Sequence, residues 1–367
     1  MKCRSVITSI SVLYCSLILS LAATGLNAAE ETLPDSASVV DRVKQLLDNA
    51  ATDGFSGAVL LEQNGEVTLE AAYGLANPAE EIPFTIATIH QIGSISKQFT
   101  ATAAAKLASE NLLDLHIPLD NYLEGHSYLS EITLHDLLTH TAGLPDNCGA
   151  DFAYRSRDEL LDDCLAGMQS EDKTDEVVYS NLGYSLIAAV IEVVSNQLFA
   201  DYVRNELLQP LNLNDTDYFF GSRDLTMFAY GKLSGEPQQP NIAYNLEELE
   251  GRHWNLMGNG GMQSTIADMR IWQMALMSNN FLNPKVAELV LTPHVMESEN
   301  LYLGYGWYIR TNNAGEIRQY SHSGSDGVFF SYLLIRPLQN LMLYFVGSNG
   351  EEEVLPILRS ILVELPD

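Results

Sequence analysis

Residues 57–74 have the sequence GAVLLEQNGEVTLEAAYG, in which two β-rich runs flank Asn64 and Gly65. An Asn-Gly pair between such runs is the strongest short-range signal for a β-hairpin. Four more β-rich runs lie in the last third of the chain, at 305–311, 317–322, 328–335 and 341–348. Because strands occur near both ends of the chain, the sequence predicts one antiparallel sheet that joins the termini.

Helical patterns surround these strands. Apolar residues at helical spacing predict a helix at 39–51 before the hairpin and another at 351–362 after the last strand. Further helical patterns lie between the two groups of strands, at 95–111, 132–140, 182–206 and 266–278. The predicted fold class is α+β: an antiparallel β-sheet flanked by N- and C-terminal helices plus an inserted helical domain. Its sheet halves would span about 36–93 and 301–367, with the insert at about 94–300.

The composition excludes two broad classes of protein. The 367 residues are 46% hydrophobic and 9% aromatic, which is enough apolar material for a folded core. Asp and Glu number 48 against 19 Lys and Arg, so the formal net charge is −29. A chain this acidic repels nucleic-acid phosphates and anionic membrane surfaces. Solubility explains the charge more simply than steering of a cationic substrate, although both interpretations stand.

The first 28 residues have the features of a signal peptide. Lys2 and Arg4 precede a mostly apolar run at 6–23, and Ala28 supplies the small residue that a signal peptidase requires. An uncleaved membrane anchor is the alternative, but serines inside the run and the small-residue end favour cleavage. The sequence therefore predicts an exported protein, periplasmic or secreted, whose mature chain at 29–367 has no membrane segment.

Two cysteines remain in the mature chain, Cys148 and Cys164. In an oxidising compartment such a pair is predicted to form a disulfide, with two buried thiols as the alternative. The acidic segment around them, at 148–175, either borders a functional site or is a surface loop. No Cys/His spacing of a metal site and no H-E-x-x-H motif occurs, so neither a metal nor another cofactor is expected.

An S-x-x-K sequence at Ser94 and Lys97 is the first candidate catalytic motif. Ser94 follows a glycine and opens a helical pattern, which places its hydroxyl at the positive helix end with Lys97 one turn further on the same face. A serine needs an adjacent base to act as a nucleophile, and a desolvated lysine can be that base. Ser170 and Lys173 match the same motif, but no helical pattern follows them, which indicates an ordinary surface segment.

A Y-x-N sequence at Tyr179 and Asn181 directly precedes the predicted 182–206 helix. A tyrosine beside a cationic lysine can pass a proton to a leaving group, and an asparagine amide can hold an acyl carbonyl. Taken alone, this sequence is most simply a helix-capping loop.

An H-x-G sequence at His322 and Gly324 lies on a predicted strand, with Ser325 after it. The glycine would allow a substrate to lie close to the strand backbone. The Ser325 and Ser94 N–H groups would then form an oxyanion hole. Taken alone, this sequence is only a strand end with a glycine.

Together these motifs resemble those of the penicillin-recognising serine hydrolases, in the branch of class C β-lactamases, serine DD-peptidases, related esterases and D-amino-acid peptidases. Residues 132–145, ITLHDLLTHTAGLP, are similar to the I-T-I-x-x-L-L-T-H-T-S-G-L segment of that branch. The GGMQST sequence at 260–265 and Tyr305-Gly306-Trp307 are also typical of it. The resemblance extends over about 39–362 and implies the same sheet-plus-insert fold, with the active site between the two parts.

The resemblance implies a role for each motif residue. Ser94 would be the nucleophile that forms an acyl-enzyme, and Lys97 and Tyr179 would share the general acid–base work. Asn181 would bind the acyl side chain, His322, Gly324 and Ser325 would line the substrate pocket, and the Ser94 and Ser325 amides would form the oxyanion hole. No cofactor is implied, and the partner is a small-molecule or short peptide substrate. The oligomeric state is left open.

His322 occupies a position where many members have lysine. A histidine with a reference pKa near 6.5 is only partly charged at neutral pH, and acidic surroundings could raise that pKa by an amount that the sequence does not give. We therefore expect weaker β-lactamase activity, and cleavage of carboxylate-bearing substrates that strengthens as the pH falls. Hydrolysis of small amides or esters, of the DD-carboxypeptidase, D-amino-acid peptidase or esterase kind, is the favoured function. A class C-type β-lactamase and a slowly acylating penicillin sensor are the alternatives.

Overall fold

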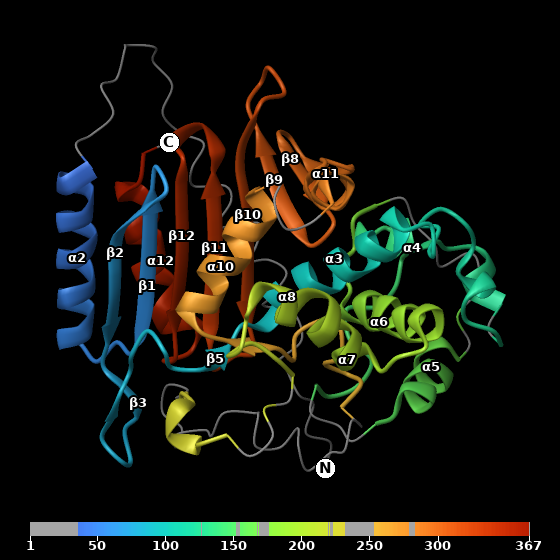
Figure 1. The fold of residues 1–367 in the computed structure, drawn as a ribbon, viewed down its shortest axis with the longest axis horizontal. Coiled ribbons are helices and arrows are strands. Elements are labelled where there is room, and N and C mark those ends of the chain that lie inside the picture. The colour runs from blue at the N-terminus through green and yellow to red at the C-terminus, as the bar shows by residue number, and fades with distance from the viewer. Residues whose placement is uncertain are drawn as a thin grey trace, which may run out of the picture.

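A computed structural model describes residues 36–366, with gaps at 126, 152–154, 167, 169–175, 219, 221–222, 232–252 and 279–282. The predicted signal peptide and the second S-x-x-K sequence, at Ser170 and Lys173, lie outside the described residues. The described residues form an eight-stranded antiparallel sheet and a group of helices beside it (Figure 1).

The large sheet joins the two ends of the chain, as the sequence predicts. Its strand order is β2-β1-β12-β11-β10-β9-β8-β7. The strands are β1 (Gly57–Gln63), β2 (Glu66–Tyr73), β7 (Val295–Ser298), β8 (Leu301–Gly304), β9 (Trp307–Thr311), β10 (Ile317–Ser325), β11 (Phe330–Arg336) and β12 (Leu341–Gly347). The N-terminal β1 pairs with the C-terminal β12 from Gly57 opposite Gly347 to Gln63 opposite Leu341. Two small sheets pair β3 (Leu75–Asn77) with β4 (Ile82–Pro83) and β5 (His90–Gln91) with β6 (Gln263–Ser264).

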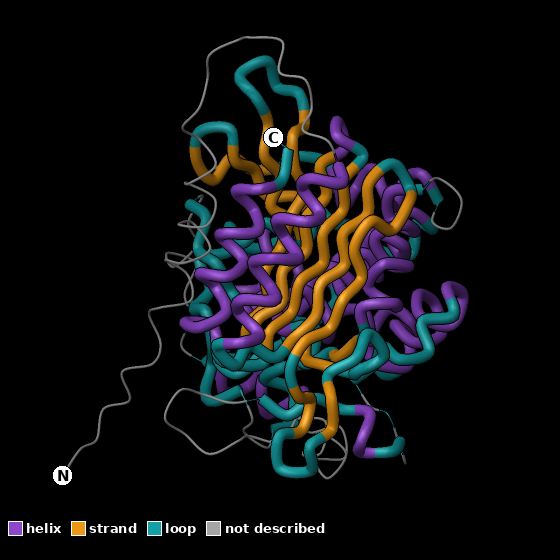
Figure 2. The backbone as a smooth tube through the Cα atoms, turned by 90° about the vertical axis from the view of Figure 1, so that its left-hand side faces the viewer, coloured by secondary structure: helices purple, strands orange, loops and turns teal. Residues whose placement is uncertain are grey.

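Helices cover both faces of this sheet. The helices are α2 (Ser36–Thr52), α3 (Ser96–Ser109), α4 (Leu134–Leu138), α5 (Arg157–Leu165), α6 (Asn181–Ser195), α7 (Phe199–Val203), α8 (Gln209–Leu211), α10 (Ile266–Met277), α11 (Pro284–Leu291) and α12 (Glu351–Glu364). The terminal helices α2 and α12 lie against one face (Figure 2), and α10 packs on β1 and β12.

Strands β1 and β12 are apolar along most of their length because both of their faces are buried. On β1, Ala58 and Leu60 belong to the core shared with the helical insert. Val59 and Leu61 point the other way and pack with α2 and α12. The same alternation holds on β12, so each strand separates two apolar layers and binds the termini to the insert.

The predicted helix at 182–206 is wrong in one respect, because two helices occupy that stretch. α6 ends at Ser195, and Asn196 takes the left-handed conformation with φ +53°. Asparagine tolerates this conformation better than most residues. Glu192 then accepts a hydrogen bond from the Phe199 N–H at 2.8 Å, which caps α7. The α6 axis and the α7–α8 axis differ in direction by 77°.

Elements that were not predicted from the sequence include α5, α11, β7 and β8. Helix α5 begins with a capping box between Ser156 and Glu159, inside the segment interpreted as an acidic loop. Helix α11 begins after Asn283, with Pro284 at its first position. The start signals of both helices are visible in the sequence. Strands β7 and β8 have only four residues each and carry no comparable signal.

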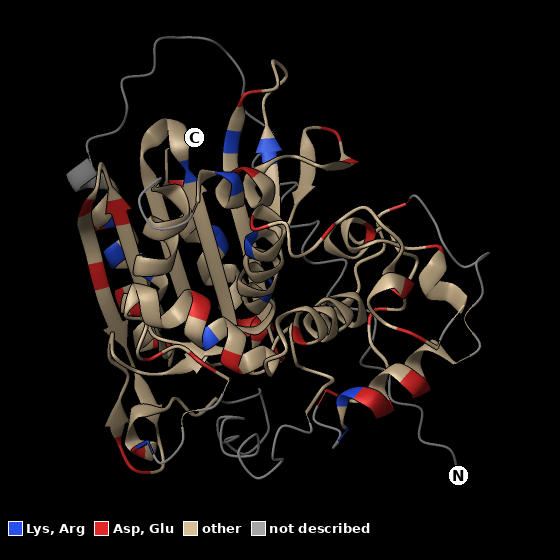
Figure 3. Ribbon diagram, turned by 45° about the vertical axis from the view of Figure 1, so that its right-hand side comes forward, with Lys and Arg blue, Asp and Glu red and all other residues tan. Residues whose placement is uncertain are grey.

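The disulfide prediction is confirmed, since Cys148 and Cys164 are bonded. Asp and Glu residues occur in both the sheet and the helical part (Figure 3). Among the described helices none is by itself long and apolar enough to cross a membrane; only the bent pair Asn181–Ser195 and Phe199–Leu211 passes by length and composition.

Candidate active site

Ser94 lies in a single 3-10 turn, Gly93–Ile95, that leads directly into α3. Gly93 and Ile95 are buried, whereas Ser94 is partly exposed. Lys97 follows in the first turn of α3 with no exposed surface, and its Nζ lies 3.0 Å from Ser94 Oγ. The two residues of the S-x-x-K motif are therefore in contact at the start of the helix.

The Lys97 ammonium has two further hydrogen-bond acceptors. Asn181 Oδ1 lies 2.6 Å from Nζ, and the backbone carbonyl oxygen of Asn259 lies 2.7 Å from it. An ammonium has three N–H donors, so these acceptors and Ser94 Oγ account for all three. Sequence reasoning missed Asn259 because a backbone carbonyl has no side-chain signal, although the GGMQST sequence directly follows it.

Asn181 is the first residue of α6, and its amide is held on both sides. Its Nδ2 donates to Asp146 Oδ1 and to Asn147 Oδ1, each at 3.0 Å. Since an ammonium can only donate, Oδ1 must be the atom that faces Lys97. Both amide hydrogens are thus used inside the protein, and an acyl carbonyl would have to displace Asp146 or Asn147 to reach Asn181.

Tyr179 is positioned by His140, a residue outside the three sequence motifs. The two rings lie 4.4 Å apart, and the Tyr179 ring centroid lies 4.9 Å from Lys97 Nζ. His140 Nδ1 accepts a hydrogen bond from the Ser180 N–H at 3.1 Å, and its carbonyl accepts one from the Val178 N–H at 2.7 Å. Complete burial, aided by the Lys97 charge, lowers the pKa of His140 well below its usual value, which keeps the imidazole a neutral acceptor.

Gly324 is required by the close approach of the Ser94 turn to β10. A Cβ at Gly324 would lie 1.9 Å from the Ile92 carbonyl oxygen and 2.9 Å from the Ser94 nitrogen. A Cβ at Gly93, whose φ is +50°, would lie 2.6 Å from the Ser325 nitrogen. The close approach therefore concerns the protein's own backbone, and not only a substrate as the sequence suggested. It places the Ser94 nitrogen next to Gly324 and the Ser325 nitrogen next to Gly93.

His322 differs electrostatically from the sequence-based expectation. Its side chain is almost completely buried, and Nδ1 lies 2.6 Å from the Ser323 carbonyl oxygen. Burial and then the Lys97 charge lower the pKa of His322 to about 3. The upward shift that acidic surroundings could have caused does not occur, because desolvation and the nearby ammonium both disfavour the imidazolium. His322 is neutral at physiological pH.

Two carboxylates face this ammonium from the loop before α5. Burial raises the pKa of Asp146 and of Asp151, and the Lys97 charge partly offsets the rise in both. Lys97 therefore interacts electrostatically with two buried imidazoles and with two partly desolvated carboxylates.

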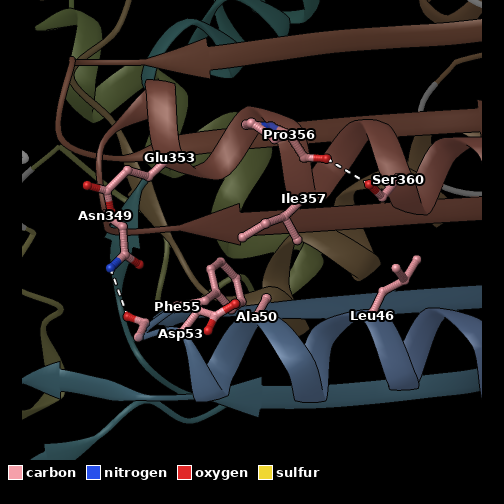
Figure 4. Close-up of a pocket in the computed structure, with 10 residues that line it drawn as sticks. Leu46, Ala50, Asp53, Phe55, Asn349, Glu353, Pro356, Ile357 and Ser360 are labelled. Carbon is pink, nitrogen blue, oxygen red and sulfur yellow. Dashed lines mark hydrogen bonds between the residues drawn. The ribbon is translucent and has the colours of Figure 1, made fainter.

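A sizeable cavity of the protein lies away from the cluster formed by Ser94, Lys97, Tyr179 and Asn181. A cavity of about 450 Å³ lies between α2 and α12, on the far face of the sheet, and contains none of the motif residues (Figure 4). It is bordered by Phe55 and by Asn349, whose Nδ2 donates to the Gly54 carbonyl at 3.0 Å. Within the described ranges, no group of three or more His, Cys, Asp or Glu side chains is arranged to hold a metal ion.

Comparison with known proteins identifies the class of fold and site. The family model described as Beta-lactamase matches residues 39–357, so the chain belongs to the Beta-lactamase family. This family, together with the penicillin-binding proteins, generally consists of serine hydrolases.

Individual relatives are penicillin-binding proteins or similar to them. The chain is 27% identical to "Penicillin-binding protein 4*" of Bacillus subtilis (strain 168), over 82% of this chain and 69% of that protein. It is 26% identical to "Protein flp" of Staphylococcus aureus (strain N315), over 81% of this chain but only 60% of that protein. A solved penicillin-binding protein from Bacillus halodurans has a TM-score of 0.74 at 25% identity and covers 88% of this chain and 98% of its own.

Proposed function

We propose that this protein is an exported serine hydrolase that cleaves small amides or esters through an acyl-enzyme on Ser94. The observation that carries the proposal is the 3.0 Å contact between Lys97 Nζ and Ser94 Oγ, at the start of a helix and partly open to solvent. A serine hydroxyl is a weak nucleophile until an adjacent base accepts its proton.

The residues around Ser94 support a two-step reaction. As Ser94 Oγ attacks the substrate carbonyl, its proton passes to Lys97 in the neutral amine form or to Tyr179 in the phenolate form, and the same pair returns that proton to the departing amine or alcohol. The Ser94 and Ser325 backbone N–H groups would stabilise the oxyanion that forms on the carbonyl oxygen. Water then attacks the acyl-enzyme by the reverse sequence of proton transfers. Asn181 holds Lys97 in place during both steps.

The neutral His322 favours substrates without an essential carboxylate next to the scissile bond. A fixed positive charge at this position would attract such a carboxylate, whereas a buried neutral imidazole offers only a hydrogen bond. This supports an esterase or a D-amino-acid peptidase more than an efficient β-lactamase. The Cys148–Cys164 disulfide supports export, because disulfides persist mainly in oxidising compartments.

A second candidate is a penicillin-binding protein that is acylated by penicillin and releases the product slowly. The penicillin-binding relatives favour this candidate. The same acyl-enzyme gives a lactamase when water attacks quickly and a penicillin-inhibited protein when it does not.

Intact-protein mass spectrometry tests the proposal and separates the candidates. The mature protein and its Ser94→Ala variant are each mixed with a nitrophenyl ester or with benzylpenicillin. Ester hydrolysis by the wild type alone supports the hydrolase. A lasting penicillin adduct on the wild type alone supports the second candidate, and released hydrolysed penicillin supports a β-lactamase. Equal ester hydrolysis by both proteins, without any adduct, would refute a reaction at Ser94.

A further inference from the structure

The disulfide lies next to the loop that holds Asn181. Cys148 directly follows Asp146 and Asn147, whose side chains accept the two Asn181 amide hydrogens. The bonded Cys164 lies in α5, where it is buried. The Asp146 carbonyl also accepts the Asn181 N–H at 2.8 Å, so this loop fixes both the backbone and the side chain of Asn181.

Arg155 links the same loop to a second segment. Its Nη1 donates to the Cys148 carbonyl at 2.7 Å and lies 3.4 Å from both Cys164 Sγ and Asn255 Oδ1. The Arg155 side chain is only 18% exposed, and its second terminal nitrogen, Nη2, lies 3.4 Å from the Asp163 carboxylate. One guanidinium thus contacts the disulfide, the loop before α5 and the segment that contains Asn255.

The second segment leads directly to Lys97. Asn255 Nδ2 donates to the Ala150 carbonyl, and the Asn255 carbonyl accepts a hydrogen bond from Asn259 Nδ2 at 2.7 Å. The Asn259 carbonyl in turn accepts from Lys97 Nζ at 2.7 Å. Of the acceptors around the Lys97 ammonium, Asn259 therefore lies in a segment that Arg155 contacts, and Asn181 is held by the loop that Arg155 contacts.

We infer that the Cys148–Cys164 disulfide and Arg155 form a brace that positions the Lys97 ammonium beside Ser94, so that reduction of the disulfide slows the reaction. This inference rests on the proposed function of Ser94 and Lys97. Arg155 is a positioning residue, because it acts through Asn255 and Asn259 and not on the substrate.

The physical reason is the precision that proton transfer requires. Lys97 Nζ must stay within hydrogen-bond distance of Ser94 Oγ, and a misplacement of about 1 Å costs on the order of a hundredfold in rate. A dithiol supplies two electrons and two protons: the S–S bond breaks, two thiols form, and the reductant closes into its own cyclic disulfide. The loop then loses its disulfide cross-link to Cys164 of α5 and holds Asn181 less firmly.

The test compares oxidised and reduced wild type with Arg155→Ala, Arg155→Lys and the double variant Cys148→Ala/Cys164→Ala. Arg270→Ala is the matched control, because it removes a similarly buried arginine whose Nε contacts Glu62 at 2.6 Å on the sheet. For each protein, kcat, KM and the pH profile of nitrophenyl ester hydrolysis are measured, together with the rate at which a fluorophosphonate labels Ser94. Circular dichroism and the thermal midpoint verify that each protein is folded.

We expect reduction, the double cysteine variant and Arg155→Ala to lower kcat by on the order of tenfold or more, with little change in KM. The pH profile should shift, since the surroundings of Lys97 change. Arg155→Lys should recover part of the rate, because lysine keeps a cationic donor for the Cys148 carbonyl. Arg270→Ala should lower the thermal midpoint without altering kcat or the pH profile.

Two outcomes separate the failure of this inference from the failure of the proposed function. Suppose that oxidised wild type hydrolyses the ester, and that mass spectrometry shows both thiols of the reduced wild type to be free. If the reduced protein then keeps the same kcat and pH profile, the brace has no catalytic role. The same holds if Arg155→Ala behaves like Arg270→Ala. If oxidised wild type neither hydrolyses the ester nor reacts at Ser94 with the fluorophosphonate, the proposed function fails and this inference fails with it. Should the double variant not fold, reduction of the folded wild type still decides.

Discussion

Gly93 and Gly324 approach each other so closely that neither position has room for a side chain. A Cβ at Gly93 would lie 2.8 Å from the Gly324 carbonyl carbon, and a Cβ at Gly324 would lie 1.9 Å from the oxygen of Ile92. Real Cβ atoms essentially never show such distances to backbone atoms. The contact joins the Ser94 turn to β10, and the relative position of the two candidate oxyanion amides depends on it.

Gly324→Ala is therefore expected to separate the Ser94 and Ser325 amides. The methyl group must push the turn away from β10, with a loss of about 1–3 kcal/mol in the free energy of unfolding and a fall in kcat on the order of a hundredfold. Urea denaturation and ester hydrolysis measure the two effects. Gly65→Ala is the control: its φ is +80° and a Cβ there would meet no neighbouring segment within 4 Å, so it should destabilise the protein without affecting the reaction.

Asn181→Leu is expected to lower kcat more than it raises KM. Leucine has a similar volume but removes the 2.6 Å acceptor for Lys97 Nζ and leaves Asp146 and Asn147 without their shared donor. The loss should be on the order of tenfold to a hundredfold. Asn147→Ala removes only one acceptor from the Asn181 amide and should have a smaller effect. A rise in KM at constant kcat would instead indicate that Asn181 mainly binds the acyl group.

His140 offers a test of how Tyr179 is positioned. His140→Phe keeps a ring beside Tyr179 but loses the acceptor for the Ser180 N–H, and it places phenylalanine at a φ of +58°. His140→Asn keeps an acceptor and tolerates this backbone conformation but loses the ring. We expect both variants to lower kcat, with asparagine the more stable of the two in urea denaturation. If both retain wild-type kcat, His140 does not position Tyr179 for the reaction.

The pKa of His322 predicts a pH profile that does not depend on this residue. Because that pKa is lowered to about 3, His322 stays neutral from pH 5 to pH 8. The profiles of kcat/KM for a carboxylate-bearing substrate should have the same shape for wild type and His322→Ala over this range. An acidic rise in the wild type that the variant lacks would show that the imidazole titrates near its reference pKa, as the sequence alone suggested.

His90 predicts that stability falls as the pH falls. Its Nδ1 donates to the Thr88 carbonyl at 3.1 Å, and its Nε2 lies 2.8 Å from the Tyr344 hydroxyl. Burial lowers the pKa of His90 to about 4. Below a pH of about 6.5 the unfolded chain binds a proton that the folded protein does not, at a cost of about 1.4 kcal/mol per pH unit until the folded pKa is reached.

His90→Gln keeps a donor and an acceptor but cannot titrate. Between pH 6.5 and 5 the wild type should therefore lose about 2 kcal/mol more unfolding free energy than this variant. Asp326 acts in the opposite direction, since burial raises its pKa to about 6, but its effect is common to both proteins and cancels in the comparison. If urea denaturation shows the same pH dependence of the unfolding free energy for both proteins, His90 is not the source of the predicted loss of stability.

Much of the fold follows from local patterns in the sequence. The Asn64-Gly65 turn predicts the β1–β2 hairpin, and the late β-rich runs predict β9 to β12. These predictions succeed because residue alternation and turn chemistry act over a few neighbouring residues. The same local reasoning fails at Asn196, where a side chain from one helix caps the next, and at β7 and β8, whose few residues gain order mainly from their neighbours in the sheet.

The sequence by itself also determined which residues form the candidate site. The S-x-x-K, Y-x-N and H-x-G motifs identify Ser94, Lys97, Tyr179, Asn181 and His322 through the chemistry of their side chains. Only the tertiary structure decided how these groups are held. The Asn259 carbonyl reaches Lys97, the Ile92 carbonyl excludes a side chain at position 324, and burial beside an ammonium keeps His322 neutral. Hydrogen bonds and desolvation depend on which distant segments meet, and a linear motif does not contain that information.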